Sequence, residues 1–307
     1  MISNDIVVGL FLLFQTVFGV LGNSFLMGLY IITFFIGPRL KPIDFLLIQL
    51  AFANDLVLLS KGIPQTMAAL GYTNFLDDVG CKLVFYFHKV ARDLSRCTTC
   101  LLSGFQVITL SPSISQWAKL KARPTKYIVQ FCFFCWTFHL LANYNILVLM
   151  KDSQGSSNIT ERKNFVYCSA KFPVSLYIGV FVFLISLPDV LCVGIMVGTS
   201  GYMIFVLYRH HQRVQYIHGH SLKPSCSPET RATQTILLLV ILFVSFFSVN
   251  SILVSYIYYE KSSSFLVHTS TFLAACFPAC SSFILIVGDS HVRKYWLIFW
   301  EKMITQF

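Results

Sequence analysis

Charged residues are scarce in this chain, and carboxylates are the scarcest of them. Only 12% of the 307 residues are charged, with 13 Asp and Glu in total, whereas about 25% is usual in a soluble domain. Hydrophobic residues make up 56% of the sequence. This balance excludes an ordinary soluble domain and predicts a chain whose solvent is mostly lipid.

The motifs of catalysis and cofactor binding are also missing. The sequence holds no phosphate-cradling glycine loop, no His-Glu-x-x-His pattern and no Gly-x-Ser-x-Gly pattern. Its apolar stretches contain too few carboxylates for the paired acids of a hydrolase. We therefore expect neither an enzyme nor a bound cofactor.

Three further classes are disfavoured by where particular residues lie. The N-terminus lacks a basic region and a short cleavable signal pattern, and its first apolar run is long enough to be a membrane span. The net charge of +10 comes from short loops between apolar runs, where basic residues set topology, so no nucleic-acid partner is expected. Most of the ten cysteines lie inside apolar runs, unlike those of a disulfide-rich secreted scaffold.

Seven apolar runs are long enough to cross a bilayer, which takes about 17 residues or more. Backbone polar groups find no partners in hydrocarbon, so all seven should be helices. We predict an all-α membrane protein with one seven-helix domain over residues 1–307 and no internal repeat. Pro64 predicts a kink in the second span. The expected spans are 6–35, 45–70, 83–110, 127–149, 174–207, 232–258 and 265–287.

The third run, Cys81 to Pro112, is the one around which the others should gather. Its polar residues recur at steps of three and four, which places them on one face of a helix. Ionisable groups in a span are costly in lipid, so this face should line a protein interior or a water-filled cavity. The polar stripe consists of His88, Arg92, Ser95, Thr99, Ser103 and Gln106.

The distribution of Lys and Arg between the connecting segments predicts the orientation. The side with more basic residues should face the cytoplasm, which puts the N-terminus outside and the C-terminal tail inside. The basic side carries Arg39, Lys41, Lys119, Lys121, Arg123, Lys126, Arg209, Arg213, Lys223, Arg231, Arg293, Lys294 and Lys302, and the other side Lys151, Arg162, Lys163, Lys171 and Lys261.

Two features of the loop after the fourth span agree with that orientation. Asn158 begins an Asn-Ile-Thr glycosylation sequon on the side predicted to be extracellular. Cys81, at the outer end of the third span, and Cys168, in this loop, are the cysteines expected to meet an oxidising compartment. We predict that these two form a disulfide that holds the loop over the mouth of the bundle.

With these residues in view, the chain resembles a rhodopsin-like G protein-coupled receptor, and more closely the vomeronasal type-1 (pheromone) receptors. Trp136 in the fourth span belongs to the broader resemblance. The resemblance covers essentially the whole chain and implies a plasma-membrane receptor that couples a small external ligand to a heterotrimeric G protein of the Gi/Go class. The narrower match rests on LAFANDLVLLSKGIP (50–64), CTTCLLSGFQVITLSP (97–112), GYMIFVLYRHHQRVQ (201–215), SPETRATQTILLLV (227–240) and CFP (276–278).

The departures from mainstream rhodopsin-like receptors are similar to those of the vomeronasal group. Phe105-Gln106-Val107 stands where an Asp-Arg-Tyr triplet is usual, and Asn54, followed by Asp55, stands where many receptors have a sodium-binding Asp. An Arg–Asp lock and a sodium pocket are therefore not expected. A bitter-taste-like chemosensory receptor also lacks the triplet and is the close rival.

Lys61, His88 and Arg92 lie in the outer halves of the second and third spans, which are neighbours in rhodopsin-like packing. One hypothesis is a cationic ligand pocket for an anionic small molecule, such as the sulfated steroids that this family is known to sense. The structural alternative has Lys61 reaching the outer interface, Arg92 bonded to backbone carbonyls, and Lys89 paired with Asp93 at i, i+4.

The inner side offers a surface for a G protein. The basic rim there also suits contact with anionic lipid. A metal site is not expected from Cys97-x-x-Cys100 and Cys132-x-x-Cys135, because both pairs lie in mid-span, where Cys is an ordinary apolar residue. The G protein-facing candidates are Gln106, Lys119, Lys121, Arg123, Arg209, Arg213 and Arg231.

The segment after the last span, about 290–304, mixes aromatic, aliphatic and charged residues and predicts an amphipathic helix on the inner leaflet. A rival function from another class is a transporter or channel that uses the buried charges as a permeation path. Transporters commonly show inverted repeats, which this chain lacks.

Overall fold

The computed structural model covers residues 1–307 and describes residues 4–36, 42–72, 75–110, 124–151, 162–164, 168–171, 177–218, 228–259 and 264–288. Several predicted features lie outside these residues. They are Asn158, the basic residues Lys119, Lys121 and Arg123, and the amphipathic segment 290–304.

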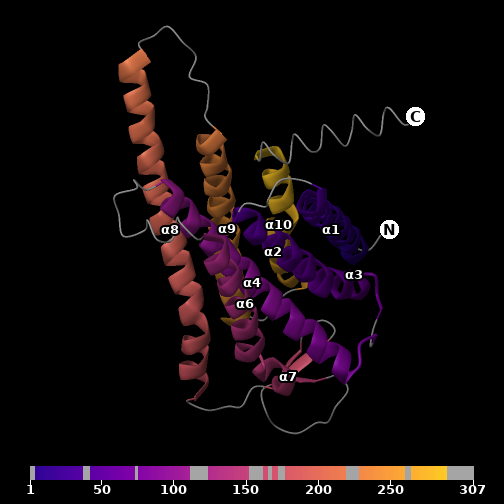
Figure 1. Cartoon of the computed structure of the whole chain (residues 1–307). Helices are drawn as coiled ribbons and strands as arrows, with labels where there is room; N and C mark the ends of the chain where they lie inside the picture. The colour runs from indigo at the N-terminus through magenta and orange to yellow at the C-terminus, as the bar shows by residue number, and fades with distance from the viewer. Residues whose placement is uncertain are drawn as a thin grey trace, which may run out of the picture.

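Long helices make up most of the described chain and run side by side in one bundle (Figure 1). Each of the seven apolar runs falls on helical structure. The second is divided by a π-helical turn, the fourth is split in two, and the fifth continues beyond its predicted end. The helices are α1 Asn4–Ile36, α2 Pro42–Val57, η1 Leu58–Gly62, α3 Ile63–Ala69, α4 Asp78–Leu110, α6 Pro124–Ala142, α7 Asn145–Leu149, α8 Tyr177–His218, α9 Pro228–Tyr259 and α10 Ser264–Gly288.

Six helical stretches in the described part of the chain are long and apolar enough to cross a membrane. They lie in α1, in α2 through α3, in α6 through α7, and in α8, α9 and α10. With 33 residues, α4 is also long enough, but its middle carries Lys89, Arg92, Asp93 and Arg96. Its sequence therefore reads as a helix enclosed by protein rather than by lipid.

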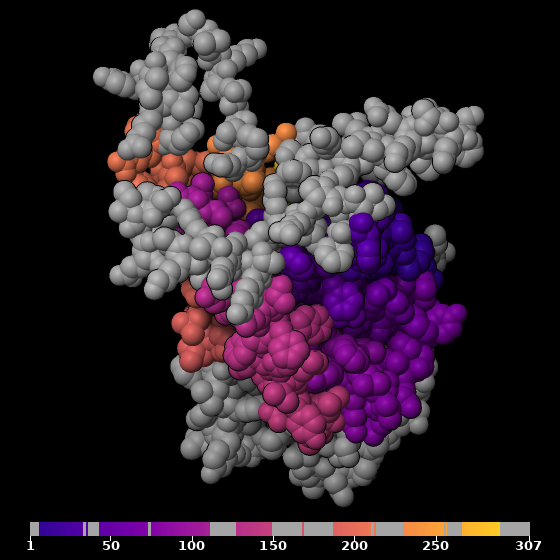
Figure 2. All heavy atoms as spheres, in the orientation of Figure 1, coloured from indigo at the N-terminus to yellow at the C-terminus, as the bar shows by residue number. Residues whose placement is uncertain are grey.

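The outside of the bundle is covered by apolar side chains. Phe14, Phe133, Leu141 and Ile252 are among many large hydrophobic residues that remain exposed. Figure 2 shows the side chains of α6 on the outside of the bundle, beside those of α2 to α4. A soluble protein rarely exposes so large an apolar surface, so this surface is suited to lipid.

The α4 helix lies in the interior of the bundle and packs against α2, α6, α8 and α9. Its Leu94 and Leu102 are fully buried, and so are its polar residues Thr99 and Ser103. Leu102 belongs to the main hydrophobic core. The polar stripe of α4 thus faces other helices, in agreement with the expected enclosure.

The irregularity in the second span lies in the turn directly before Pro64, where a proline removes the hydrogen bond to the residue four positions earlier. The helix widens into the π-helical turn η1, Leu58–Gly62, and Pro64 follows within the first turn of α3. At Gly62, an added Cβ would collide with the side chain of Thr16, so glycine allows α1 to approach η1 closely here. The α3 helix ends before Gly71, whose φ of 90° ordinary side chains rarely adopt.

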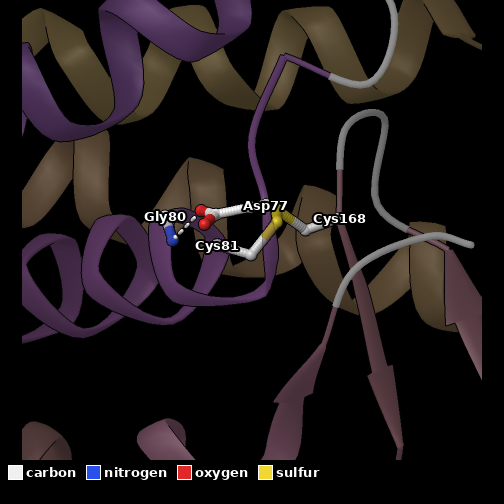
Figure 3. The surroundings of a disulfide bond; sticks show 4 residues. All are labelled: Asp77, Gly80, Cys81 and Cys168. Carbon is white, nitrogen blue, oxygen red and sulfur yellow. Dashed lines mark hydrogen bonds between the residues drawn. A yellow bond between two sulfur atoms is a disulfide. The ribbon is translucent and has the colours of Figure 1, made fainter. Parts of the chain in front are cut away.

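A small antiparallel sheet, which the sequence did not predict, follows the fourth span. It consists of β1 Met150–Lys151, β2 Arg162–Asn164 and β3 Ser169–Lys171 in the order β1-β3-β2. Cys168 directly precedes β3 and forms the predicted disulfide with Cys81, with a Cα–Cα distance of 6.0 Å (Figure 3).

The disulfide meets α4 in its first turn. The Asp77 carboxylate accepts a hydrogen bond from the Gly80 backbone N–H at 2.7 Å, which caps this end of the helix (Figure 3). Asp78 adds negative charge in the first turn, where the helix dipole favours it. The start of α4 is therefore fixed both by its cap and by the covalent link to the sheet.

Candidate ligand chamber and its charged surroundings

A cavity lies between α1, η1, α4 and α10. Its empty space is about 280 Å³, including the part open to the surroundings. Leu12 and Leu58 provide apolar wall, while the polar wall comes from Gln15, Lys61 and His88. Two of the three predicted ligand-binding residues are thus brought together at one small chamber, which is lined by both apolar and polar groups, as binding sites commonly are.

The π-helical turn helps to form this chamber. Leu58, Lys61 and Gly62 of this turn line the cavity, and π-bulges are frequent at functional sites. The Lys61 side chain lines the cavity, and the Ser60 hydroxyl lies 3.5 Å from His88 Nδ1 on α4. The alternative in which Lys61 only reaches for the outer interface does not describe this arrangement.

Arg92, the third predicted ligand-binding residue, lies one helical turn after His88. Its Nε is buried and has no hydrogen-bond partner among the described residues. The proposed bonds to backbone carbonyls are not found in that part of the chain. Arg92 and His88 lie on α4, which packs against the η1 turn that carries Lys61.

A second polar contact connects the neighbourhood of the chamber to α10. Gln65 Nε2 on α3 lies 3.4 Å from His268 Nδ1, and both residues are buried. Ser270, two residues later, donates a hydrogen bond at 3.0 Å to Asn250 on α9. His268 was not predicted as a site residue, because a lone His in an apolar run carries no spacing signal.

An ion-pair network lies next to this region, centred on Asp93. Lys89 Nζ lies 2.8 and 3.0 Å from the two Asp93 carboxylate oxygens, which confirms the predicted i, i+4 pair. Arg96 donates to the same carboxylate at 2.9 Å, and Asn143, after α6, donates to it at 3.1 Å. Asp93 thus connects two cations of α4 with the end of the fourth span.

Arg96 extends the network to two further helices. Its Nη2 lies 2.6 Å from the Asp189 carboxylate on α8, and its guanidinium lies 5.9 Å from the centroid of the Phe247 ring on α9. The Arg96 side chain is only 3% exposed. A buried arginine is tolerated when carboxylates and an aromatic face surround it in this way. The sequence could not show this, because the contact depends on how α4 and α8 align.

The middle of α4 is packed rather than open. Ser95 donates to Asn54 Oδ1 at 2.6 Å, and Asn54 donates to Ser281 on α10 at 2.8 Å. Gln49 donates to Thr98 at 2.8 Å. The expectation of a polar stripe lining a hollow therefore holds at His88 but not farther down the helix, where the same stripe joins α2, α4 and α10.

At the far end of α4, Gln106 is buried and donates a hydrogen bond at 2.7 Å to Thr233 on α9. Arg231 is partly buried and donates to the Val287 carbonyl at 3.3 Å, while Arg209 is exposed. Arg213 lies on the same helix as Arg209, four residues later. In this structure Gln106 is an internal contact between two helices and does not reach the surface.

The mid-span cysteines are not gathered together as a three- or four-ligand metal site would require. No group of three or more His, Cys, Asp or Glu residues suited to a metal ion occurs in the part of the chain that the structure describes. Cys97 and Cys135 do lie close together, with their sulfur atoms 3.2 Å apart. They link α4 to α6 within a small apolar cluster.

Fold and site together define a multi-pass helical membrane protein with a partly polar chamber inside its bundle. Residues 6–298 match the vomeronasal organ pheromone receptor family. The chain is 44% identical to human vomeronasal type-1 receptor 1 over 290 residues, which are 94% of this chain and 81% of that receptor. It is 42% identical to vomeronasal type-1 receptor 4 of Pongo pygmaeus over 295 residues, 96% of this chain and 98% of that receptor.

A more distant relative is olfactory receptor class A-like protein 1 of Danio rerio, 29% identical over 287 residues. The shared region is 93% of this chain and 90% of that protein. The chain belongs to the vomeronasal organ pheromone receptor family, which confirms the narrower resemblance seen in its motifs. The relatives are receptors in name, and the chain is a multi-pass protein of the plasma membrane.

Proposed function

We propose that this chain is a G protein-coupled pheromone receptor of rhodopsin-like architecture, with α4 as the third of seven spans. An external small molecule would bind in the chamber and favour one arrangement of the helices, and its effect is limited by its difference in affinity for the two arrangements. The observation that carries this proposal is the cavity lined by Lys61 and His88 in a chain of the vomeronasal receptor family.

The contacts of α4 support its role as a span despite its charges. Lys89 and Arg96 are matched by Asp93 and Asp189, so these four charges cancel inside the bundle. Pairing of this kind lowers the cost of ionisable groups at membrane depth. Counted together with α4, the six apolar stretches would make the seven crossings of the proposed single domain over residues 1–307.

The two ends of α4 support the orientation with the N-terminus outside and the tail in the cytoplasm. The disulfide joins the first turn of α4 to the small sheet, and disulfides persist in oxidising compartments. Arg209 lies in the C-terminal part of α8 and Arg231 in the first turn of α9, and these are the ends predicted to be cytoplasmic. On this orientation Asn158 faces outside, where it would be glycosylated.

The charges of the chamber favour an anionic or acceptor-rich ligand. Lys61 and Arg92 bring positive charge to a region with apolar walls, where electrostatic attraction is stronger than in water. His88 adds a hydrogen-bonding ring at the same wall. A steroid sulfate combines an apolar body with one anionic group and fits this combination.

The inner ends of α4, α8 and α9 would dock the G protein, for which we propose the Gi/Go class. Gln106 joins α4 to α9 through Thr233 in the position where a charged lock is absent. Separation of these helices would open the inner face. The proposed rim around it consists of Lys119, Lys121, Arg123, Arg209, Arg213 and Arg231, which would also contact anionic lipid.

The test is expression in cells that carry a promiscuous Gα subunit, with matched sulfated and unsulfated steroids as ligands. Arg92→Ala should remove the preference for the sulfated partner while the receptor still reaches the cell surface. Lys82→Ala, which changes a cation of α4 away from the cavity lining, should keep the preference. If Arg92→Ala still preferred the sulfated steroid, the role of this arginine would be refuted. If wild type responded to neither the sulfated nor the unsulfated steroids, this ligand class would be refuted.

A further inference from the structure

Two cations in the outer part of the bundle have no anionic partner in the described part of the chain. Lys89 and Arg96 are both paired with carboxylates. Lys61 and Arg92 form no ion pair with any carboxylate that the structure describes. The difference is informative because all four lie on α4 or on η1 beside it.

None of the described carboxylates of the surrounding helices pairs with Lys61 or Arg92. Asp93 binds Lys89, Arg96 and Asn143. Asp189 binds Arg96, and Asp55 accepts a hydrogen bond from Ser24 on α1 at 2.9 Å. The described side chains therefore leave an excess of positive charge at Lys61 and Arg92.

These two cations lie on packed elements, because η1 contacts α4, Ser60 beside Lys61 lies 3.5 Å from His88, and Arg92 follows His88 by one helical turn. Burial of unpaired like charges is unfavourable, and proteins normally relieve it with a counter-ion. An ammonium and a guanidinium are both donors to anions, and Arg92 Nε is a buried donor without a partner among the described residues.

Space for a small ion is available next to Lys61. The cavity is lined by Lys61 and His88 on one side, and by Gln15 and Thr271 from α1 and α10. This cavity is partly open and has room for about one water-sized particle, so it can take a single bare halide in contact with its walls.

We propose that the unliganded receptor holds a small inorganic anion, chloride in extracellular fluid, between Lys61 and Arg92, and that the anionic group of a ligand displaces it. The first half concerns the chain alone. The second half rests on the proposed function. Activation by an anionic ligand would then weaken as external chloride rises, whereas a neutral ligand would be unaffected.

The first half is tested with purified full-length receptor in nanodiscs, without any ligand. Thermal unfolding and equilibrium binding of radiolabelled chloride are measured while sodium gluconate is replaced by sodium chloride at constant ionic strength. Wild-type receptor should be stabilised saturably by chloride. Loss of one of the two cations, in Lys61→Met or Arg92→Gln, should raise the half-saturating concentration by about tenfold or more. Lys82→Met is the matched control and should respond as wild type.

Absence of chloride binding to wild type would overturn the proposal, and so would a wild-type response in either variant. If a variant and wild type unfold at different temperatures without chloride, the gap between their unfolding temperatures is followed as chloride rises. A gap that changes with chloride supports the site, whereas a constant gap contradicts it.

The second half is tested in cells with a steroid sulfate and a neutral analogue. A potency that falls with external chloride for the sulfate alone supports displacement. If chloride binds but does not change the potency of the steroid sulfate, the bound anion is supported and its displacement by the ligand is contradicted. Silence toward all ligands, together with measured chloride binding, would count against the proposed function while leaving the anion site standing.

Discussion

The ion-pair network around Asp93 allows a quantitative prediction about stability. Asp93 accepts hydrogen bonds from Lys89, Arg96 and Asn143, and its side chain is only 6% exposed. Asp93→Asn preserves the shape but, among the described residues, leaves the partly buried Lys89 without a carboxylate and the buried Arg96 with Asp189 alone. Removal of one partner from a buried ionic group typically costs about 3–5 kcal/mol.

The matched control is Ser95→Ala, two residues later on the same helix. It removes one neutral hydrogen bond, from Ser95 to Asn54 at 2.6 Å, in an equally buried place. Neutral hydrogen bonds inside membrane proteins contribute about 0.6 kcal/mol on average and rarely more than about 1.7. Asp93→Asn should therefore cost at least about twice as much as Ser95→Ala.

Unfolding in mixed micelles can be followed through the buried thiol of Cys135, which should react with a fluorescent maleimide when the bundle opens. The double variant Asp93→Asn with Lys89→Met should recover part of the loss, because it removes the cation that lost its one carboxylate partner among the described residues. If Asp93→Asn costs no more than Ser95→Ala, the network does not stabilise the bundle as an ionic unit, and the reasoning is refuted.

Three further variants test other contacts. Gln106→Ala removes the hydrogen bond to Thr233 that holds α4 against α9, and this separation is the one proposed to open the inner face. One such bond contributes about 1 kcal/mol, so signalling without ligand should rise roughly fivefold. Gly62→Ala should lower stability by about 1–3 kcal/mol, because its Cβ would collide with Thr16 at the π-helical turn. Cys81→Ser removes the disulfide to Cys168, which lies 87 residues later in the sequence. In the chain-entropy estimate such a cross-link stabilises the fold by about 4–5 kcal/mol, so the amount of folded receptor at the cell surface should fall.

Each variant has a control within the chain. Ser245→Ala removes only a bond to its own helix and should leave basal signalling unchanged. Gly104→Ala adds a Cβ with no atom within 4 Å and should be tolerated. Cys280→Ser removes a free, exposed thiol and should not reduce surface expression. Equal effects of variant and control would mean that the named contact is not the cause.

Much of the fold could be predicted from hydrophobic length. Six of the seven expected spans were visible as apolar runs, since the bilayer thickness fixes how many apolar residues a crossing needs. The special position of α4 was visible from its polar stripe and from Cys81. Pro64 indicated an irregularity in the second span, but not that it would take the form of a π-helical turn at Leu58–Gly62. The small sheet lies in a loop with no strand pattern long enough to detect.

The site was predictable only in part for a similar reason. Lys61 and His88 could be proposed because basic residues in apolar runs are rare and demand an explanation. The partner of Lys89 followed from helical spacing. Asp189 and Asn143 could not be assigned to Arg96 and Asp93, because those contacts join helices whose relative register is set by packing. Asn158 stays a prediction, since it lies outside the described residues.

The measurement that most directly tests whether α4 crosses the membrane is thiol labelling at its two ends. Lys82→Cys and Thr109→Cys lie 27 residues apart, or about 40 Å along a helix, which exceeds the hydrocarbon thickness of about 30 Å. With the unsubstituted chain as the baseline, an impermeant maleimide on intact cells should label position 82, and position 109 should be labelled only after permeabilisation. Labelling of both positions from the same side would contradict a spanning α4 and, with it, a chamber that connects the outside to the inner face.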